Sequence, residues 1–423
     1  MTTRSYPRLD ESIQTVTLDN GLHIYCIPRE SSAKTFAMLA VNFGSIDCNF
    51  TLDGRTYDVT PGIAHFLEHK MFEEKDGNAL QKLTALGAQP NAFTSHTMTA
   101  YHFTCTSRFA ECLEILLRFV TTPYFTEENV AKEKGIIEQE ISMLDDRPSW
   151  QAYVGVMEGL YAVHPVRISV AGSRQSIAPI DPAILELCHR GFYAPSNLAL
   201  IVCGQYDFDQ VVDLAKRMTP TQSATIASRS YGVEPEQAAA SYVEKNMAVS
   251  RPLFMLGCKD TVPEQPYRRQ LIGELAAACV CGKSTVLYDT LYQKGVLNRT
   301  FEPNYFTFSG GACALFSGES DNPQVVREAL EDEMRRIASE GLADAVFNRA
   351  KKAAYGRYIR QTNDPAEICR MQAEACFSGA QCFDFAEILQ QVTTEQVLER
   401  IRQWARDGMT TLAVVAPKKE AKA

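Results

Sequence analysis

The chain has 423 residues, of which 45% are hydrophobic and 22% are charged, as is typical of a globular protein. This length exceeds one ordinary core, so two or more domains are expected. A net charge of −9 argues against a nucleic-acid-binding protein, which would carry a basic patch. No run reaches the roughly 18 apolar residues that a membrane helix needs, so no membrane span is expected.

The thirteen cysteines predict a reducing compartment. Their number is odd and they are scattered through apolar stretches such as LALIVCG, which favours buried thiols over a disulfide framework. The opening residues, MTTRSYPRLDESIQ, contain no apolar run of the kind found in a secretory signal. The sequence therefore predicts a cytoplasmic protein.

The first half of the chain predicts alternating strands and helices. Asp19-Asn20-Gly21 predicts the turn of a β-hairpin over residues 16–27. Thr126 is a suitable N-cap for the helix that follows it. Apolar periodicity predicts strands at 35–43, 91–106 and 198–204 and helical regions at 61–87, 108–120, 126–146 and 181–190.

The same order of elements recurs in the second half. Residues 218–240 are polar, contain two prolines and predict a linker. Beyond it, strands are predicted at 251–258, 304–317 and 411–416 and helices at 265–293, 323–339, 342–361, 365–378 and 393–406. The fold class is therefore α+β, with two similar domains, each a mainly antiparallel sheet packed with helices. They span residues 1–217 and 241–423.

The stretch HFLEHKMFEE contains the pattern HxxEH, with His65, Glu68 and His69. Residues four apart lie on one helix face, so the two imidazoles can reach one zinc ion. Glu68 is suited to take a proton from water without binding the metal. The order is the reverse of the HExxH motif. A surface helix with two solvated histidines is the alternative, but it leaves the coincidence of three residues unexplained.

Catalytic zinc commonly has three protein ligands, so one more ligand is required. Glu133 and Glu140 lie seven residues apart in TEENVAKEKGIIEQEISMLDD, two turns along one helical face. Periodicity does not distinguish between them. A solvated acidic face is the alternative.

Several stretches in order resemble the inverted-motif zinc peptidases of the pitrilysin, insulin-degrading enzyme and mitochondrial processing peptidase type. They are TLDNGLHIY, VNFGSIDC, GIAHFLEHKMFE, QPNAFTSHTMTAY, EKGIIEQE, HPVRISVAGSRQSI and FYAPSNLALIVCG. The resemblance is close over the first half and architectural over the second. It implies one Zn²⁺ per chain.

The resemblance also implies roles for individual residues. His65, His69 and Glu140 would be the zinc ligands, and Glu68 the general base. Glu133 would be an accessory carboxylate beside a ligand, although a plain surface carboxylate is an equal alternative. The strand with Asn91 and Ala92, in QPNAFTSH, would be an edge to which a substrate peptide adds as a further strand.

The second half cannot repeat the zinc site, because the last histidine is His189. In the resembling family, a pattern LRxxGLxY in this half supplies an arginine and a tyrosine to the substrate. The aligned stretch is LYQKGVLN, with Tyr292 and Asn298 at those positions. A heterodimer with a homologous chain that supplies the pair is therefore expected, in preference to a homodimer. Local substitution by Arg299 or Tyr305 is the alternative.

These observations predict a zinc endopeptidase for short, unstructured peptides. The rival prediction is a non-catalytic scaffold or assembly subunit on the same fold. The presence of both histidines and both functional glutamates argues against a scaffold, and a closed structural zinc site would be expected to use cysteines, which the motif lacks.

Overall fold

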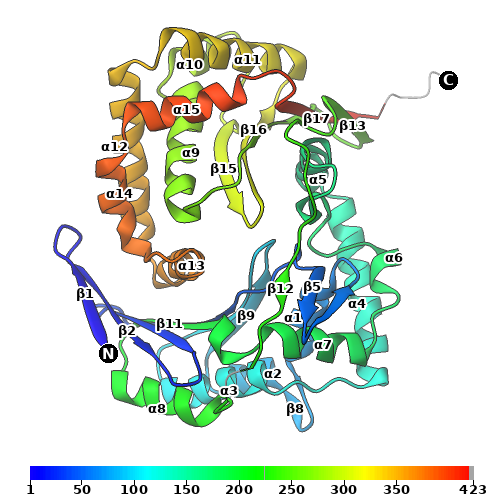
Figure 1. Ribbon diagram of the computed structural model, residues 1–423, viewed down its shortest axis with the longest axis vertical. Coiled ribbons are helices and arrows are strands. Elements are labelled where there is room, and N and C mark those ends of the chain that lie inside the picture. The colour runs from blue at the N-terminus through cyan, green and yellow to red at the C-terminus, as the bar shows by residue number, and fades with distance from the viewer. Residues whose placement is uncertain (223, 419–423) are drawn as a thin grey trace. The chain divides into compact units, whose positions relative to one another are not determined.

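The computed structural model describes residues 1–222 and 224–418, and these form two compact units. Unit 1 comprises Met1–Ile141, Ser169–Ser230 and Arg360–Phe383. Unit 2 comprises Ser142–Ile168, Tyr231–Ile359 and Asp384–Ala423. Each unit has a β-sheet with helices packed on it (Figure 1). The predicted α+β class is confirmed.

Unit 1 is built on a seven-stranded sheet with the order β1-β2-β3-β11-β4-β10-β9. The strands are β1 (Thr2–Tyr6), β2 (Glu11–Thr17), β3 (His23–Pro28), β4 (Thr35–Val41), β9 (Gln89–Thr94), β10 (Thr99–Cys105) and β11 (Leu198–Gly204). β11 is parallel to β3 and antiparallel to β4. β2 and β3 form the predicted hairpin, and Gly21 takes a φ of 89° in its turn. In the described part of the chain, β9 pairs only with β10, so one edge of β9 is open.

Helices cover both faces of this sheet at its centre. β4 and β11 are buried at every residue, because α3 packs on β4 and β10 while α13 packs on β11 and β4. Figure 1 shows α13 and α3 on opposite sides of these strands. The helices that begin in unit 1 are α1 (Ile63–Met71), α2 (Ala79–Ala85), α3 (Phe109–Thr121), α4 (Glu127–Asp145), α6 (Arg174–Ile177), α7 (Pro182–Phe192), α8 (Phe208–Met218) and α13 (Pro365–Cys376).

Short strands complete unit 1. They are β5 (Asn49–Leu52), β6 (Arg55–Asp58), β7 (Glu73–Glu74), β8 (Gly77–Asn78) and β12 (Ser228–Arg229). β7 and β8 form a small hairpin between α1 and α2, inside the region that periodicity predicts as helical throughout. Asn78 ends that hairpin and caps α2, because its side chain accepts from the backbone N–H of Leu80.

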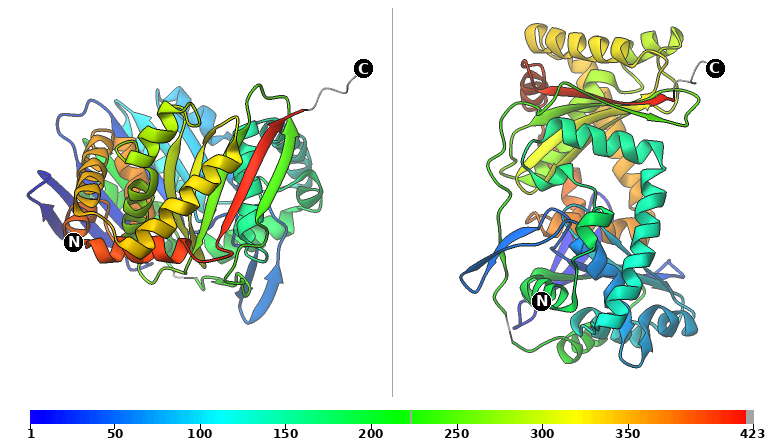
Figure 2. Two further views of the ribbon diagram at one scale, coloured as in Figure 1. Left: turned by 90° about the horizontal axis from the view of Figure 1, so that it is seen from above. Right: turned by 90° about the vertical axis from the view of Figure 1, so that its right-hand side faces the viewer.

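Unit 2 is built on a five-stranded sheet with the order β13-β17-β14-β16-β15. The strands are β13 (Tyr242–Met247), β14 (Leu253–Asp260), β15 (Glu302–Phe308), β16 (Gly311–Glu319) and β17 (Thr410–Pro417). β17 and β13 lie side by side and are parallel (Figure 2). The helices are α5 (Pro148–Leu160), α9 (Pro266–Cys281), α10 (Val286–Gln293), α11 (Pro323–Glu340), α12 (Asp344–Gln361), α14 (Phe385–Gln391) and α15 (Thr394–Trp404).

The two sheets share one topology. In unit 1 the last strand, β11, pairs in parallel with β3 and antiparallel with β4, and β10 then β9 follow. In unit 2 the last strand, β17, pairs in the same way with β13 and β14, and β16 then β15 follow. In this shared order, β14 and β15 correspond to β4 and β9. α9 lies between the first two along the chain, as α1 lies between the second two. The predicted architectural repeat is confirmed.

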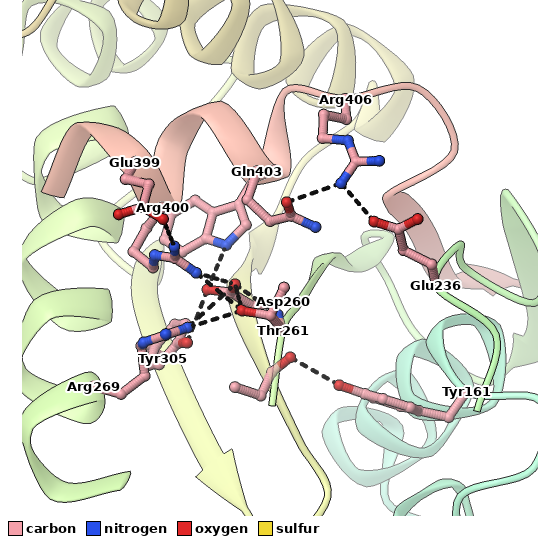
Figure 3. Close-up of polar contacts among 12 residues, drawn as sticks. Tyr161, Glu236, Asp260, Thr261, Arg269, Tyr305, Glu399, Arg400, Gln403 and Arg406 are labelled. Carbon is pink, nitrogen blue, oxygen red and sulfur yellow. Dashed lines mark hydrogen bonds and ion pairs between the residues drawn. The ribbon is translucent and has the colours of Figure 1, made fainter. Parts of the chain in front are cut away.

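A buried ionic cluster lies in the core of unit 2 (Figure 3). The side chain of Asp260 is 0% exposed and accepts hydrogen bonds from Arg400 Nη1 at 2.8 Å and the Tyr305 hydroxyl at 2.9 Å. Trp404 Nε1 donates to the same carboxylate at 3.1 Å. Because a buried carboxylate requires this many donors, the cluster ties β14, β15 and α15 together.

Two predicted strands are hairpins in the structure, so those predictions were wrong. The predicted strand 91–106 is β9 and β10, joined by a turn in which Ser95 Oγ accepts from the N–H of Met98 at 3.1 Å. The predicted strand 304–317 is β15 and β16, joined at Ser309 and Gly310, where Gly310 has a φ of 87°. Apolar alternation continues through both turns, so periodicity alone could not locate them.

The two units differ from the predicted boundaries at 217 and 241. α5 lies in the sequence of the predicted first domain but packs on β14 and β17 of unit 2. α13 lies in the sequence of the predicted second domain but packs on β11 and β4 of unit 1. An amphipathic helix shows which face it buries, but not which sheet covers that face. Residue 223 of the predicted linker and residues 419–423 lie outside the described residues.

No single helix within residues 1–222 and 224–418 is long and apolar enough to cross a membrane. α9 and α10 reach that length and composition only together, as a pair bent by 48°. The thirteen cysteines are free thiols, and all except Cys376 are buried.

Candidate metal centre

The segment that follows α5 supports the start of α1. Gly62 precedes α1 with a φ of 94°, and a Cβ at this position would lie 2.7 Å from the carbonyl oxygen of Ala171. Ser176 Oγ donates to the carbonyl of Pro61 at 2.7 Å, and Thr60 donates to the carbonyl of Ser176. The stretch VAGSRQS therefore fixes where α1 begins, and with it the direction in which the histidines point.

His65, His69 and Glu140 form one cluster. Their candidate ligand atoms all lie within 4.8 Å of one another. His65 Nε2 lies 3.5 Å from Glu140 Oε1, and His69 Nε2 lies 3.4 Å from Glu140 Oε2. In the part of the chain that is described, this is the one group of three or more histidine, cysteine and acidic side chains with such spacing.

The spacing of these atoms suits a tetrahedral zinc ion. Ligand atoms that are roughly 2.0–2.1 Å from such an ion lie about 3.3–3.4 Å apart. The hydrogen bonds with His65 and His69 hold the pKa of Glu140 well below its usual range. Burial opposes a charge on His69, but hydrogen bonds to Glu133 and Glu140 outweigh that effect and raise its pKa to about 10. The two carboxylates therefore favour positive charge at His69, and a proton and a metal cation would compete for it.

Glu133 lies beside this cluster and contacts one histidine. Its Oε1 is 3.1 Å from His69 Nδ1. A carboxylate at Nδ1 keeps the proton on that nitrogen and leaves the lone pair of Nε2 free for a metal. Periodicity did not distinguish the two glutamates. In the structure Glu140 contacts both histidines at Nε2, whereas Glu133 contacts only His69, at Nδ1.

Glu68 is buried next to the cluster, with 8% of its surface exposed. Its Oε2 accepts a hydrogen bond of 2.6 Å from the hydroxyl of Thr94. Burial raises the pKa of Glu68 above its usual value, although the charge of His65 and the Thr94 hydrogen bond oppose this shift. A carboxylate with a raised pKa is suited to exchange protons near neutral pH.

Asn91 and Ala92 lie on β9, the open edge of the unit 1 sheet. The N–H of Ala92 donates to Asn91 Oδ1 at 2.9 Å, so this N–H is not used by β10. Pro90 precedes them and has no N–H to offer, as is common at sheet edges. Thr94, at the end of the same strand, connects this edge to Glu68.

Tyr292 and Asn298 lie in unit 2, at and after the end of α10. Tyr292 is 37% exposed and stacks on Tyr288 with ring centroids 5.8 Å apart. Asn298 Nδ2 donates to Glu319 at 3.0 Å. Arg299 is exposed, whereas Tyr305 is 4% exposed and donates its hydroxyl to Asp260. Tyr305 is therefore fixed in the core of unit 2 and is unsuited to replace a substrate-binding tyrosine.

Comparison with known proteins identifies the family. Residues 53–174 match the family described as Insulinase (Peptidase family M16), and residues 179–354 match the Peptidase M16 inactive domain. A relative in Bacillus subtilis (strain 168), named uncharacterized zinc protease YmfH, is 35% identical over 422 residues and covers 98% of each chain. The chain belongs to peptidase family M16. The resemblance predicted from the motifs is thereby confirmed.

Solved structures of the M16 fold agree with this assignment. A crystal structure of an M16-like peptidase from Alicyclobacillus acidocaldarius has a TM-score of 0.93 and 30% identity, and covers 98% of this chain and 100% of its own. A chain in complex III2 from Candida albicans has a TM-score of 0.76 at 12% identity, with 95% of each chain covered. The second likeness shows the fold alone.

Sequence reasoning missed one residue of this M16 site. Thr94 lies two residues after Ala92 in QPNAFTSH and is the hydrogen-bond donor to Glu68. The sequence did contain an indication of its role, because a polar residue two positions after Ala92 lies on the same face of the strand as Ala92. The predicted single strand over 91–106 obscured the fact that β9 ends there.

Proposed function

We propose that this M16 chain is a zinc-dependent endopeptidase that hydrolyses short, unstructured peptides. The observation that supports the proposal most directly is the convergence of His65 Nε2, His69 Nε2 and both Glu140 oxygens at 3.4–3.5 Å, beside a buried Glu68. A surface helix with two solvated histidines would have no reason to bring these atoms together. The name of the relative in Bacillus subtilis, uncharacterized zinc protease YmfH, points the same way.

His65, His69 and Glu140 would hold the metal, which when bound supplies a Lewis acid for the scissile carbonyl and lowers the pKa of the attacking water. Glu68 would take the proton of that water and pass it to the leaving amine. The Thr94 hydroxyl holds Oε2 of Glu68 in place at 2.6 Å, so Oε1 remains for proton transfer. The raised pKa of Glu68 favours its return to the acid form in the second step.

The open edge of β9 would bind the substrate backbone. A peptide that adds to this edge forms main-chain hydrogen bonds, which do not depend on its side chains. Asn91 Oδ1 occupies the N–H of Ala92 in the free chain at 2.9 Å, and a substrate carbonyl would replace it there. Since only an extended peptide can add as a strand, folded proteins would be poor substrates.

The test is metal analysis and peptide hydrolysis by the wild-type chain and by Glu68→Gln. The variant is expected to keep its zinc and its unfolding midpoint, because Glu68 is not placed among the ligands. Its rate is expected to fall by about 10²–10⁴-fold, as for the loss of a general base. Loss of zinc from the variant, or cleavage at the wild-type rate, would contradict the proposal.

A non-catalytic scaffold is the second candidate, because the fold also occurs in a chain of complex III2. A scaffold predicts that neither Glu68→Gln nor zinc removal changes any measurable activity. The presence of both histidines together with Glu68 and Glu140 favours the peptidase.

We further propose that this chain is the metal-bearing subunit of a two-chain enzyme. Neither Tyr292 nor Asn298 carries a positive charge, so a homodimer would bring weak stabilisation to a developing oxyanion. The hydroxyl of Tyr305 donates its hydrogen bond to Asp260 in the core of unit 2, so Tyr305 does not replace the missing tyrosine. A homologous chain with an arginine and a tyrosine at the two positions would complete the site.

A further inference from the structure

Lys70 follows His69 directly on α1, and its side chain is 0% exposed. A buried ammonium group is tolerated only where oxygen atoms replace the water that it loses. Here Nζ donates to the backbone carbonyl of Asn129, on α4, at 3.1 Å. It also lies 3.0 Å from Glu73 Oε2 and 3.5 Å from Glu133 Oε2. Lys70 is therefore held between α4 and β7.

Glu133 is shared between Lys70 and a candidate metal ligand. One oxygen, Oε1, is 3.1 Å from His69 Nδ1, and the other, Oε2, faces Lys70. Each oxygen of the Glu133 carboxylate therefore has a partner on α1, His69 for Oε1 and Lys70 for Oε2.

The other histidine has no comparable support. His65 Nδ1 is buried and makes no hydrogen bond within residues 1–222 and 224–418. Of the two histidines, only His69 thus has a partner at Nδ1, and this partner, Glu133, is in turn contacted by Lys70.

We propose that Lys70 is a positioning residue of the metal centre, which holds Glu133 against His69 Nδ1 and thereby directs His69 Nε2 toward the metal. The inference rests on the proposed zinc site. Without Lys70, Glu133 and Glu73 would face a buried space with no cation between them. Glu133 would then turn toward solvent, and His69 would lose the partner that fixes its ring and its proton.

The experiment is a double-mutant cycle on zinc affinity, measured by competition with a chelator in wild type, Lys70→Met, Glu133→Gln and the double variant. Lys70→Met is expected to weaken zinc binding by about 10–100-fold, the cost of losing a carboxylate partner of a metal-bound histidine, because Lys70 acts through Glu133. In the Glu133→Gln background the same substitution should have little further effect, because the residue through which Lys70 acts has lost its charge. Unchanged affinity in Lys70→Met, or an equal loss in both backgrounds, would overturn the inference.

Lys82→Met is the matched control. Lys82 also bridges two carboxylates, Glu74 at 2.9 Å and Asp76 at 2.8 Å, but it touches neither Glu133 nor a histidine in the contacts described. Its removal should leave zinc affinity within about twofold. The unfolding midpoints of the zinc-free variants distinguish a folding defect from an effect on metal binding. If Lys70→Met does not fold, Lys70→Gln takes its place, because glutamine keeps a donor for the Asn129 carbonyl. Wild type that binds no zinc would overturn the proposed function as well, whereas wild type with zinc and an inert Lys70→Met would overturn the inference alone.

Discussion

At the scale of single residues, Glu133 and Glu140 lie on one face of α4 but differ in their surroundings. The side chain of Glu140 is 39% exposed and meets both histidines at Nε2. The side chain of Glu133 is 9% exposed and meets His69 at Nδ1. Because of the two helical turns between them, one carboxylate lies at Nε2 of the imidazole and the other at Nδ1. Of the two, only Glu140 contacts both histidines in the contacts described.

Glu140→Gln is therefore expected to weaken zinc binding far more than Glu133→Gln. Loss of a ligand removes a charged metal contact, whereas loss of a partner of a ligand typically costs about 10–100-fold in affinity. Zinc content after dialysis against a graded series of chelators would compare the two. Equal zinc retention in both variants would show that the geometry had been misassigned.

Thr94→Val tests the residue that sequence reasoning missed. The substitution keeps the shape of the side chain but removes the donor to Glu68 Oε2, and we expect a fall in kcat of about 10–100-fold with zinc content unchanged. The hydrogen bond from Thr94 lowers the pKa of Glu68, so its loss should raise that pKa further. Because the base must be ionised, the acidic limb of the pH–rate profile should move to higher pH. A profile with an unmoved acidic limb would argue that Glu68 is not the titrating base.

At the scale of elements, the two corresponding edge strands differ. β9 is open along its outer edge, whereas β15 is covered by the side chain of Gln270 on α9. Gln270 Nε2 donates to the carbonyl of Tyr305 at 2.6 Å, and Gln270 Oε1 accepts from the N–H of Thr307 at 3.0 Å. An amide side chain thus makes the two hydrogen bonds that an added strand would make. The helix that carries His65 and His69 in unit 1 has a counterpart, α9, that covers the edge strand in unit 2.

Gln270→Ala is expected to destabilise unit 2 without affecting peptide cleavage. It leaves two part-buried backbone groups of β15 without their partner, which should lower the free energy of unfolding by about 1–3 kcal/mol. Urea unfolding would measure this loss. Gln324→Ala is the control, because Gln324 is exposed and bonds only to Glu328 on its own helix in the contacts described. A loss of activity in Gln270→Ala at full folding would indicate that this edge takes part in substrate binding.

At the scale of the whole molecule, the predicted linker makes hydrogen bonds to each unit on either side of the point where the chain passes from unit 1 to unit 2. On the unit 1 side, the N–H of Ser230 donates to Asn49 at 2.9 Å. On the unit 2 side, Glu234 accepts from three successive backbone N–H groups and from Lys259 Nζ at 2.7 Å. The three N–H groups belong to Ala162, Val163 and His164, at 2.7–2.9 Å. Three residues remain between the two anchors, so most of the region 218–240 is not a free tether.

Glu234→Gln should lower stability in a pH-dependent way. Burial opposes the charge on Glu234, but Lys259 and the backbone donors outweigh it and lower the pKa. A lowered folded-state pKa contributes stability above the unfolded value of 4.5, and this contribution disappears as pH falls through the folded value. The variant should therefore be less stable by about 1–3 kcal/mol at pH 7, with a smaller difference in acid. A difference that stays constant from pH 7 to pH 3 would contradict this account.

The proposed partner is also tested at this scale. The zinc-loaded chain alone is expected to cleave unstructured peptides weakly, and a homologous chain with the arginine and tyrosine should restore turnover. The double substitution Tyr292→Arg with Asn298→Tyr is expected to raise the activity of the chain alone, because it introduces the missing charge and hydroxyl. Efficient turnover by the unmodified chain without any partner would refute the two-chain proposal.

The features that the sequence determined by itself are those in which the interacting residues are neighbours along the chain. His65 and His69 share a helix face because they are four residues apart. Thr126 Oγ1 caps α4 by accepting from the N–H of Asn129, and β11 begins and ends at the predicted residues. The turn at Gly21 follows from local turn chemistry in the same way.

Contacts between distant parts of the chain were decided only by the tertiary structure. Glu140 and Glu133 are equivalent on their own helix, and they differ only because α1 approaches them from one direction. α5 and α13 carry apolar faces that either sheet could cover, and each packs on the sheet that is remote in sequence. Lys70 looks like a solvated helix residue in the sequence, yet it is buried because Glu133, Glu73 and the Asn129 carbonyl surround it. Periodicity specifies which face of an element is buried, whereas packing in three dimensions selects what lies against it.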